Sequence, residues 1–447
     1  MKAESLATRI ECSGSTYNML YDSAGAPFAF PLAPEFTNWR DEQDAWRKTA
    51  IFQDMSFHMC NMLIEGREVT RLLSDLGINS FASFGPMQAK QYVCCNDDGL
   101  YVGDAILTCE GEKQVNLVGK PNLLNWVRFH IETGKYDARV AAFDKPSPNL
   151  ADQRLFRFQV QGPNAQAIIE EAAEGHLPPI GFFKMGRFRI GRHEVTALNH
   201  RMSGAPGYEM WGPAEIGREV ASTILSIGKK HGLRRLGGRN YPVTATESGW
   251  LSSVLPAIYT GDATTAYREW LPAESYESNA SIGGSYPTVD IANCYLTPFD
   301  MGYGFMAKFD HEFRGRRALE GAAKGRPRKK IRLVWNADDT ASIHASMFGD
   351  GQRFKYMEMP VANYSTFQMD EVLADGKRVG ISYHPVYSVE SRAWISLAVV
   401  DESVAQGSRD LTVTWGEAKG GSKKSTVEQH VQKVVRAVVE TRAVRRD

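Results

Sequence analysis

The sequence predicts an α+β protein that ends in an all-β domain, and three patterns of residues support this prediction. Strand and helix patterns follow one another over 155–231 in the order β-α-β-β-α, which is typical of an antiparallel sheet with helices on one face. Three further strand patterns form a meander over 90–119, where the turns NDDG and EGE join them. From about residue 329 onward the chain consists mostly of short strand patterns.

The composition is that of a globular protein without a strongly charged partner. Of the 447 residues, 43% are apolar and 23% are charged, and a chain of this length divides into roughly two to four domains. Lysine plus arginine and aspartate plus glutamate each number 52, so no net field attracts nucleic acid or an acidic membrane surface. The sequence also lacks the run of about 18 apolar residues that a membrane span needs.

The cysteines and the N-terminal residues bear on where the protein works. The six cysteines show neither CxxC nor metal-ligand spacing, which favours reduced thiols and gives no reason to expect a metal. The N-terminal residues MKAESLATRIECSG lack the apolar core of a signal peptide. We therefore expect a cytoplasmic protein.

The elements before the meander can be predicted from caps and periodicity. The segment PLAPEFTNWRDEQDAWRKTA offers Thr37 or Asn38 as the cap of a helix with an acidic first turn. The next segment, AIFQDMSFHMCNMLIEG, is strand-like and is interrupted at Phe57 and His58. A helix is expected over REVTRLLSDLG, because its leucines recur on one helical face and Gly77 ends the pattern.

The chain after the meander begins with a polar, proline-bearing run over 143–154, which is predicted to join two domains. The segment RLFRFQVQG then alternates apolar and polar residues, which predicts a half-buried strand. The remaining predicted elements are a helix over 164–173, strands around 188–198 and 207–211, an amphipathic helix over 215–231 that Gly232 stops, and five strands after 329. Spacing alone would also allow a helix over 427–439.

The stretch 237–270 is expected to be irregular through its first half, because Pro242 and Pro256 interrupt helices and several glycines mark changes of direction. It nevertheless carries a group of polar and aromatic side chains: Arg239, Tyr241, Glu247, Trp250 and Tyr259. Such side chains on a loop held by a scaffold suit a ligand site, although an ordinary long surface loop has the same composition.

The motifs of the common enzyme classes are missing from the sequence. No HExxH and no GxSxG occur, and the GYG at 302–304 lacks the third glycine of a dinucleotide-binding loop. Gly119 and Lys120 have no phosphate-loop spacing before them. These observations argue against a zinc protease, a serine hydrolase, a kinase and a nicotinamide-dependent enzyme.

Four segments resemble the folate-dependent aminomethyltransferase family, typified by the glycine-cleavage T-protein. They are DMSFHM at 54–59, LYVGDAIL at 100–107, SGAPGYEMWGP at 203–213 and GGRNYPVTATESGW at 237–250. Other blocks, among them APEFTNWR, LPAIYTGD, AYREWLPA and YGFMAKFDH, are similar to the tetrahydrofolate-dependent O-demethylases of vanillate, syringate and related methoxy-aromatic acids.

The resemblance implies three domains arranged as a ring around a central channel for tetrahydrofolate. Residues 1–52 and 150–325 would form a discontinuous folate-binding α+β domain. Residues 53–149 would form an α+β domain whose β-meander completes the site, and residues 326–447 would form the β-rich C-terminal domain.

The resemblance also implies a reaction. The methyl group of a methoxy-substituted aromatic acid would move to N5 of tetrahydrofolate, giving a phenol and 5-methyltetrahydrofolate. The substrate class stays open among vanillate, syringate, 3-O-methylgallate and dicamba, and neither a metal nor an obligatory protein partner is implied.

Two alternatives belong to the same fold. One is another folate-dependent methyl or aminomethyl transferase, of the sulfonium or glycine-cleavage type. Gly103 stands where that family has the first of two paired acids, so only Asp104 remains, and Ala205 and Pro206 replace a Glu-Asp pair. These departures argue against aminomethyl transfer. The other is a folate-binding protein without methyl transfer, whose K-G-C-Y-x-G-Q-E motif is absent.

Residue roles follow from the same resemblance. Tyr241 would be the catalytic group, because a neutral phenol can donate a hydrogen bond or a proton to a departing phenolate oxygen. The residues implied to bind the substrate are His58, Lys120 and Phe30. The residues implied to bind tetrahydrofolate are Glu209, Arg239, Trp250, Phe182, Val118 and Gln159.

Two of these positions differ from the related demethylases. Lys120 stands where an arginine is expected, which keeps the charge but loses the two-pronged geometry of a guanidinium. Phe30 stands where a tyrosine is expected, so one hydrogen bond to the ring substituents is lost. Whether Lys120 faces the aromatic acid or the glutamate tail of folate stays open at this point.

Overall fold

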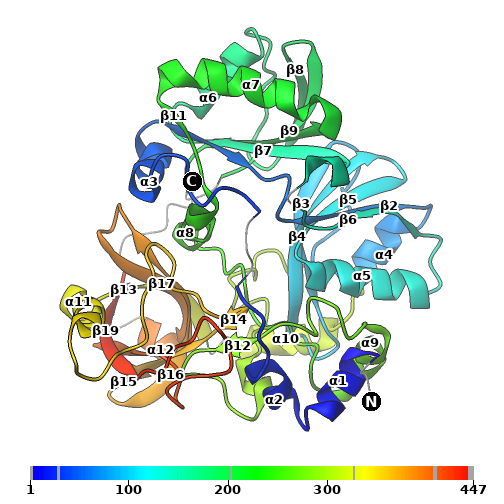
Figure 1. Cartoon of the computed structure of the whole chain (residues 1–447). Coiled ribbons are helices and arrows are strands. Elements are labelled where there is room, and N and C mark those ends of the chain that lie inside the picture. Colours follow the sequence, from blue (N-terminus) through cyan, green and yellow to red (C-terminus); the bar gives the residue numbers. More distant parts are fainter. Residues whose placement is uncertain are drawn as a thin grey trace.

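The computed structural model describes residues 4–27, 31–147, 149–201, 204–325, 328–405 and 410–440. Within these ranges a six-stranded sheet, a five-stranded sheet and a closed barrel surround a common centre, as Figure 1 shows. Helices accompany the two open sheets, and the barrel is built from the last part of the chain. The predicted α+β class with a β-rich C-terminal domain is therefore confirmed.

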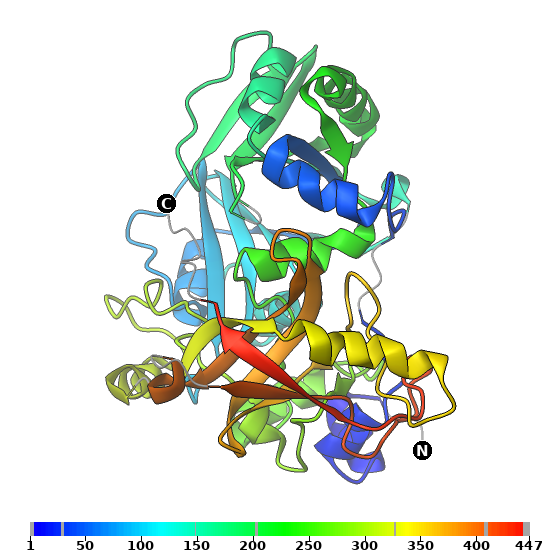
Figure 2. The ribbon, with the colours of Figure 1, turned by 90° about the vertical axis from the view of Figure 1, so that its left-hand side faces the viewer.

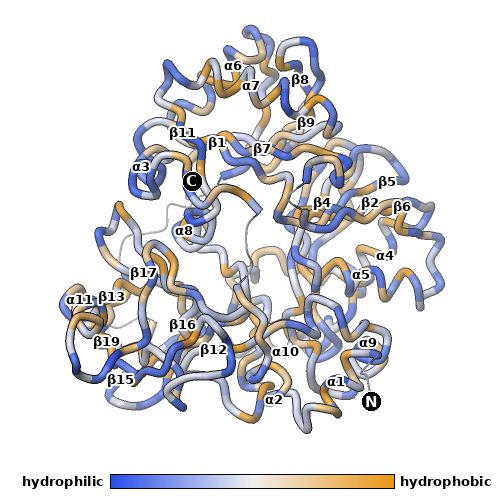
Figure 3. The backbone as a smooth tube through the Cα atoms, in the orientation of Figure 1, coloured by the Kyte–Doolittle hydropathy of each residue, from blue (hydrophilic) through white to orange (hydrophobic). Residues whose placement is uncertain are grey.

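The six-stranded sheet has the order β11-β1-β7-β10-β9-β8. Its strands are β1 (Ala50–Asp54), β7 (Leu155–Gln161), β8 (Met185–Ile190), β9 (His193–Asn199), β10 (Gly207–Pro213) and β11 (Leu233–Arg235). Helices α6 (Ala165–Ala172) and α7 (Gly217–Gly228) cover the face that points away from the centre (Figure 1). Figure 3 shows hydrophobic and hydrophilic residues alternating along these helices, as expected for helices that pack one face on a sheet.

Strand β7 is buried on both faces, so the prediction of a half-buried strand was wrong. Phe156, Phe158 and Val160 pack in the core under α6 and α7. Arg157 and Gln159 point to the opposite face, yet they are only 1% and 2% exposed. The alternation in RLFRFQVQG therefore separates a helix-covered face from a face that looks into the centre of the molecule.

The five-stranded sheet has the order β3-β4-β5-β2-β6, and all its pairs are antiparallel. Its strands are β2 (Cys60–Glu65), β3 (Gln88–Cys95), β4 (Tyr101–Gly111), β5 (Gln114–Gly119) and β6 (Arg139–Asp144). The predicted meander is confirmed as β3, β4 and β5. Helices α4 (Val69–Leu76) and α5 (Pro121–Thr133) pack on this sheet, and α4 ends at Gly77 as predicted.

The closed barrel has the order β13-β17-β16-β15-β18-β19. Its strands are β13 (Arg328–Trp335), β15 (Asp370–Ala374), β16 (Lys377–Ser388), β17 (Ala393–Asp401), β18 (Leu411–Trp415) and β19 (Lys433–Val439). Strand β19 pairs with both β18 and β13, so the ambiguous segment 427–439 ends in a strand that closes the barrel. Helices α11 (Ala337–Ala345) and α12 (Glu402–Ala405) lie beside it, and Figure 2 gives a second view of α11 and β19.

The remaining elements are short and connect the three β-structures. The helices are α1 (Leu6–Cys12), α2 (Thr16–Tyr21), α3 (Trp39–Lys48), α8 (Tyr241–Glu247), α9 (Thr265–Trp270) and α10 (Arg316–Gly325). Strands β12 (Ile282–Gly283) and β14 (Phe367–Gln368) pair in parallel. The 3₁₀ turns are η1 (Leu150–Asp152), η2 (Ala214–Ile216), η3 (Lys229–His231), η4 (Gly238–Asn240), η5 (Asp262–Thr264), η6 (Ile291–Cys294) and η7 (Ser346–Phe348).

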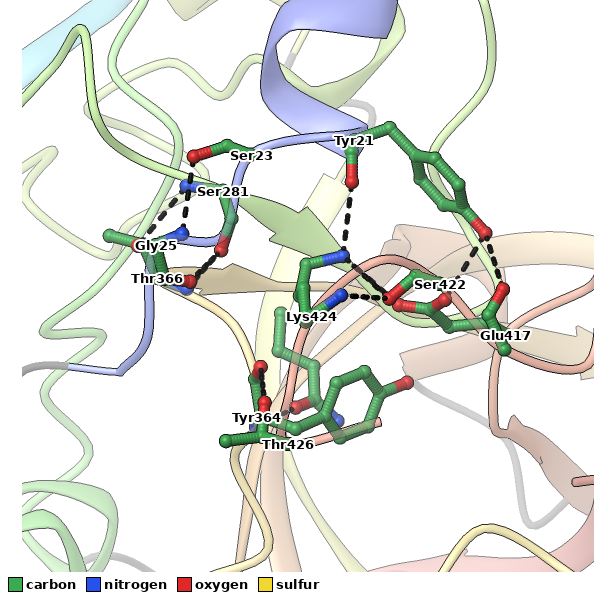
Figure 4. Close-up of polar contacts among 12 residues, drawn as sticks. Tyr21, Ser23, Gly25, Ser281, Tyr364, Thr366, Glu417, Ser422, Lys424 and Thr426 are labelled. Carbon is green, nitrogen blue, oxygen red and sulfur yellow. Dashed lines mark hydrogen bonds and ion pairs between the residues drawn. The ribbon is translucent and has the colours of Figure 1, made fainter. Parts of the chain in front are cut away.

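The N-terminal segment is tied to the C-terminal part of the chain by side-chain hydrogen bonds (Figure 4). The Tyr21 hydroxyl donates to Glu417 Oε2 at 3.1 Å, and Lys424 Nζ donates to the Tyr21 carbonyl at 3.2 Å. The Ser281 hydroxyl donates to the Gly25 carbonyl at 2.5 Å. Helix α2 is thereby attached to the segment after β18 of the barrel, and the residues after α2 are attached to the chain just before β12.

Helix α8 corrects the expectation that the stretch 237–270 begins irregularly. Residues 241–247 are α-helical because Pro242 occupies the first turn, where a backbone N–H has no partner within the helix. Tyr259 also differs from its expected role. It is 1% exposed and its hydroxyl donates to the Glu277 carbonyl at 2.9 Å, so it is a core residue.

Helix α3 begins at the predicted cap, where the Asn38 side chain accepts from the Asp41 N–H at 3.0 Å. This helix also carries Glu42, which is 0% exposed. Glu42 Oε2 accepts from Gly237 N and from Asn240 Nδ2, both at 2.9 Å. The carboxylate therefore holds the segment that leads into α8.

We predict that Glu42→Ala lowers the free energy of unfolding by about 3 kcal/mol, because several buried donors lose a charged acceptor. Urea unfolding followed by tryptophan fluorescence measures this loss. The matched control is Asp44→Ala on the same helix, where a solvent-exposed ion pair with Lys48 is removed and little change is expected. Equal effects of the two substitutions would refute the anchoring role of Glu42.

Candidate functional site

A cavity of about 1130 Å³ lies where the two sheets, α8 and the barrel meet. Strands β7 and β10 contribute Arg157, Gln159 and Glu209, and strand β4 contributes Asp104. Helix α8 contributes Tyr241. The volume lies slightly above the roughly 300–1,000 Å³ of typical ligand pockets, and the walls mix apolar and polar groups.

A buried ion pair forms one wall. Arg157 Nη1 donates to Glu209 Oε1 at 2.6 Å, and Gln159 Nε2 donates to Glu209 Oε2 at 2.7 Å. Burial raises the pKa of the Glu209 carboxyl, but the charge of Arg157 and these hydrogen bonds outweigh burial, so the pKa lies below its ordinary value. Glu209 is therefore an ionised acceptor inside the protein.

This wall retains hydrogen-bonding capacity for a ligand. Among the described residues, Arg157 Nε, Arg157 Nη2 and Gln159 Oε1 are buried without a hydrogen-bond partner. Each oxygen of the Glu209 carboxylate can accept a second hydrogen bond. The group therefore suits a planar ring with neighbouring N–H donors and a carbonyl acceptor, as in an aminopyrimidinone.

Asp104 is a second, partly buried carboxylate of the cavity wall. Its Oδ2 accepts from Gln91 Nε2 at 2.6 Å, from Trp250 Nε1 at 3.0 Å and from the Tyr303 hydroxyl at 3.0 Å. The Tyr101 hydroxyl donates to Oδ1. These donors come from several parts of the chain, so Asp104 fixes the Trp250 ring against the cavity.

Gly103, the neighbour of Asp104, faces helix α5. A Cβ atom at this position would lie 2.8 Å from Asn122 Nδ2 and 2.9 Å from Leu123 Cβ. A second carboxylate therefore has no room at position 103 unless α5 moves.

Tyr241 and His58 meet edge to face, with ring centroids 4.7 Å apart. Burial, followed by the charges of Glu209 and Asp104, raises the pKa of Tyr241 far above its ordinary value. Burial also lowers the pKa of His58 to about 4, against the opposing effect of Glu209. Both rings are therefore neutral near pH 7, and the Tyr241 phenol keeps its proton as a hydrogen-bond donor.

Lys120 supplies a cation to the cavity from the position before α5. Its Nζ donates to the Ser252 carbonyl and the Ser253 hydroxyl. Burial lowers the pKa of Lys120 to about 8, although the charge of Asp104 acts in the opposite direction. The ammonium group is therefore mostly charged at pH 7 and titrates within an accessible pH range.

The third carboxylate of the wall, Glu247 of α8, joins α8 to α3 and to the barrel. Its Oε2 accepts from Trp46 Nε1 at 3.1 Å and from Arg47 Nη2 at 2.7 Å. Its Oε1 accepts from the Ser388 hydroxyl at 2.7 Å. Because α8 also carries Tyr241, these contacts fix the position of the tyrosine.

The cavity brings together most of the residues that the sequence singled out. Those that line it are Tyr241, His58, Lys120, Glu209, Gln159, Trp250, Val118 and Phe182. Phe182 is 55% exposed and lies at the edge, with the Arg201 guanidinium 5.2 Å from its ring centroid. Phe30 lies outside the described residues.

Arg239 is not among the residues that line the cavity. Its guanidinium pairs with Glu35 Oε1 at 3.1 Å and donates to the Met359 carbonyl. It lies in η4, the turn that precedes α8, and its partners Glu35 and Met359 also do not line the cavity. The expectation that Arg239 binds folate is therefore not supported by its position.

The sequence did not single out Arg157, although it completes the site. It lies on the strand that was predicted to be half-buried, where a polar residue is usually assigned to the solvent face. The sequence did contain a signal. Arg157, Gln159 and Gln161 alternate with apolar residues along one strand, and the polar face of such a strand can line a cavity instead of meeting solvent.

Comparison with solved structures identifies the fold class of the protein. It matches the crystal structure of glycine cleavage system aminomethyltransferase T from Bartonella henselae with a TM-score of 0.61 and 16% identity, covering 94% of this chain and 95% of that chain. The protein therefore has the aminomethyltransferase fold. Of the described residues, none belongs to a helix long and apolar enough to cross a membrane.

The sequence comparisons then define the family. The model of the GCVT N-terminal domain matches residues 18–254. Syringate O-demethylase from Sphingobium sp. (strain NBRC 103272 / SYK-6) is 39% identical over 98% of this chain and 95% of its own. Sesamin methylene transferase from Sinomonas sp. (strain No.22) is 28% identical over 79% of this chain and 78% of its own. The chain belongs to the GCVT family and is a methyltransferase of that family.

We predict that Glu209→Ala lowers the free energy of unfolding by about 3–5 kcal/mol, because the substitution leaves the Arg157 cation buried without a counter-ion. Urea unfolding measures the loss. The control is Glu219→Ala, which removes an exposed partner of Arg192 on the outer helix α7 and should change stability little. A cost for Glu209→Ala no larger than that of the control would show that Arg157 finds another partner.

Proposed function

We propose that the protein is a tetrahydrofolate-dependent O-demethylase of methoxy-substituted aromatic acids. It would transfer the methyl group to N5 of tetrahydrofolate and release a phenol and 5-methyltetrahydrofolate. The observation that carries the proposal is the placement in one cavity of an ionised Glu209, a neutral Tyr241 and a cationic Lys120. The similarity to syringate O-demethylase over nearly the whole chain supports the same reaction.

The Glu209 wall fits the pterin ring of tetrahydrofolate. A pterin presents a 2-amino group and a ring N–H on one edge, which match the two acceptor oxygens of a carboxylate. Its carbonyl oxygen matches the buried donors of Arg157. Trp250, Val118 and the exposed Phe182 ring would contact the flat faces of the pterin and benzoyl groups. When bound, tetrahydrofolate supplies the N5 amine that accepts the methyl group.

Lys120 and His58 of the same cavity fit an aromatic carboxylate. The Lys120 ammonium has one N–H left after its bonds to Ser252 and Ser253 and can donate it to a carboxylate oxygen. His58, neutral and against Tyr241, can hydrogen-bond a ring substituent. We therefore propose that Lys120 binds the aromatic acid rather than the glutamate tail of folate.

Tyr241 would act on the oxygen that leaves. As the O–CH₃ bond breaks, negative charge develops on the phenolic oxygen, and a neutral phenol O–H can stabilise it by donating a hydrogen bond. A tyrosinate could not do so. Burial, and after it the charges of Glu209 and Asp104, raises the pKa of Tyr241, so the hydroxyl keeps its proton and acts as a hydrogen-bond donor.

We also propose that the enzyme works in the cytoplasm on small molecules alone. The six cysteines are free thiols, and five of them are buried, which suits a reducing compartment.

A second candidate is methylene transfer from a ring-fused methylenedioxy group. The similarity to sesamin methylene transferase favours it over the sulfonium and glycine-cleavage types. Aminomethyl transfer is further disfavoured by the lack of room for a second acid at Gly103.

The test is an anaerobic substrate panel with tetrahydrofolate, in which folate products are identified by mass spectrometry. Syringate, vanillate, 3-O-methylgallate, 2-methoxybenzoate and dicamba are compared with sesamin and with a sulfonium donor. Formation of 5-methyltetrahydrofolate from a methoxybenzoate establishes the proposed reaction. A one-carbon product only from sesamin, or only from the sulfonium donor, would replace it with the corresponding alternative.

We predict that Tyr241→Phe lowers kcat by about 100-fold or more, because the leaving oxygen loses its donor while the ring still packs against His58. The dissociation constant of tetrahydrofolate should stay within about twofold. Steady-state kinetics and a fluorescence titration measure the two quantities. The control is Tyr136→Phe, whose hydroxyl bonds Asp75 outside the cavity. Wild-type turnover in Tyr241→Phe would remove this residue from the chemistry.

We predict that kcat/KM for the aromatic acid is highest below pH 8 and falls about tenfold per pH unit above it. The reason is that Lys120, with a pKa lowered to about 8, loses the charge that binds the carboxylate as pH rises. The Lys120→Arg variant should lack this fall, because a guanidinium stays charged. A fall at the same pH in Lys120→Arg would assign the titration to another group.

A further inference from the structure

The direction of the Lys120 ammonium depends on a segment that has no regular structure of its own. Residues Ser252 and Ser253 follow α8 outside any helix or strand. They nevertheless take two of the three N–H groups of Lys120, through one carbonyl and one hydroxyl. The third N–H, which is the one available to a ligand, is aimed by these two bonds. Contacts with another part of the chain must therefore hold Ser252 and Ser253 in place.

The barrel holds this segment through a histidine. His384 Nε2 lies 3.0 Å from the Ser253 carbonyl oxygen, and its Nδ1 lies 2.6 Å from Asn363 Nδ2. A carbonyl oxygen can only accept, so Nε2 carries the hydrogen. Nδ1 is then the acceptor, and the Asn363 amide donates to it. Both neighbours of the ring thus select the same tautomer.

The backbone of His384 has an unusual conformation that accompanies this contact. Its φ is 49°, in the left-handed region that few residues other than glycine adopt. The register between β16 and β17 shifts between Tyr383 and Val386, so His384 sits in an irregularity of the barrel. Such irregularities re-aim a side chain out of a strand, and here the ring reaches the neighbouring segment rather than a position in the barrel.

The charges around Lys120 agree with a neutral His384. The titratable groups that interact with Lys120 are Asp104 of β4, His58 after β1, and His384. Burial, and after it the charge of Lys120, lowers the pKa of His384 to about 4. The ring therefore remains a neutral donor to Ser253 throughout the pH range in which Lys120 titrates.

We propose that Ser253 and His384 are positioning residues through which the barrel orients the Lys120 ammonium toward the bound aromatic acid. The identity of that acid rests on the proposed function, whereas the coupling of His384 to Lys120 does not.

The first test is kinetic. Ser253→Ala should raise the KM of the aromatic acid about tenfold and change the KM of tetrahydrofolate less than about twofold, because one acceptor that aims Lys120 is lost. Ser253→Thr keeps a hydroxyl and should restore most of the affinity. His384→Leu should act like Ser253→Ala, whereas His384→Gln, with an amide N–H at similar reach, should restore it. His344→Gln on α11 is the control for loss of a histidine elsewhere in the C-terminal part.

The second test needs no substrate. The rate at which acetic anhydride modifies Lys120 is measured against pH by mass spectrometry, which gives the midpoint of its titration. In Ser253→Ala the midpoint should move down by about 0.5 pH units or more, because the charged form loses a hydrogen-bonding acceptor. In His384→Leu it should move in the same direction, because Ser253 is no longer held in place to accept from Lys120.

The two tests distinguish the positioning of Lys120 from the proposed demethylation reaction. A shifted midpoint without turnover of any methoxybenzoate would uphold the positioning of Lys120 and reject the proposed reaction. An unshifted midpoint in both variants, with folded protein confirmed by thermal unfolding, would overturn the positioning role even if the enzyme demethylates.

Discussion

The cavity depends on one constraint, which is that each buried or partly buried carboxylate in its wall needs donors from other parts of the chain. A charge inside a protein is tolerated only where it is paired and hydrogen-bonded. Glu209 of β10 is satisfied from β7, and Glu247 of α8 is satisfied from α3 and β16. Asp104 of β4 is satisfied by Trp250 and Tyr303 as well as from its own sheet. These hydrogen bonds require the sheets and the barrel to keep one relative arrangement. The same hydrogen bonds therefore fix the shape of the cavity.

The same burial sets the chemistry of the groups that face the cavity. It disfavours the charged forms of Tyr241, His58 and Lys120, while the pairing with Arg157 keeps Glu209 ionised. The cavity therefore holds an ionised carboxylate, a titratable cation and two neutral rings in contact. An enzyme that moves a methyl group between two bound molecules needs groups that select each partner and a donor that keeps its proton.

Local patterns predicted the elements of the fold and only part of the site. Caps, glycine stops and periodicities of two and 3.6 gave most strands, but of the helices only α3, α4, α6 and α7. Pro242 was taken as a helix breaker, yet the first turn of α8 accommodates it. Arg157 was not predicted as a site residue, because the polar face of the strand that became β7 was expected to be exposed to solvent. The family resemblance pointed to Glu209 and Lys120, which line the cavity, and to Arg239, whose guanidinium pairs with Glu35 outside the cavity lining.

Contacts between distant residues explain what no local pattern could supply. Ser253 and His384 are separated by 131 residues, and they meet only because a left-handed residue at a strand irregularity turns out of the barrel. Lys330 of the barrel likewise donates to the Gly249 carbonyl at 2.6 Å. The stretch 237–254 supplies both the phenol donor and the acceptors of Lys120, and it is held by α3 at its start and by the barrel after α8. A change in the barrel can therefore alter how the aromatic acid is bound while the folate wall, built on β7 and β10, stays as it is.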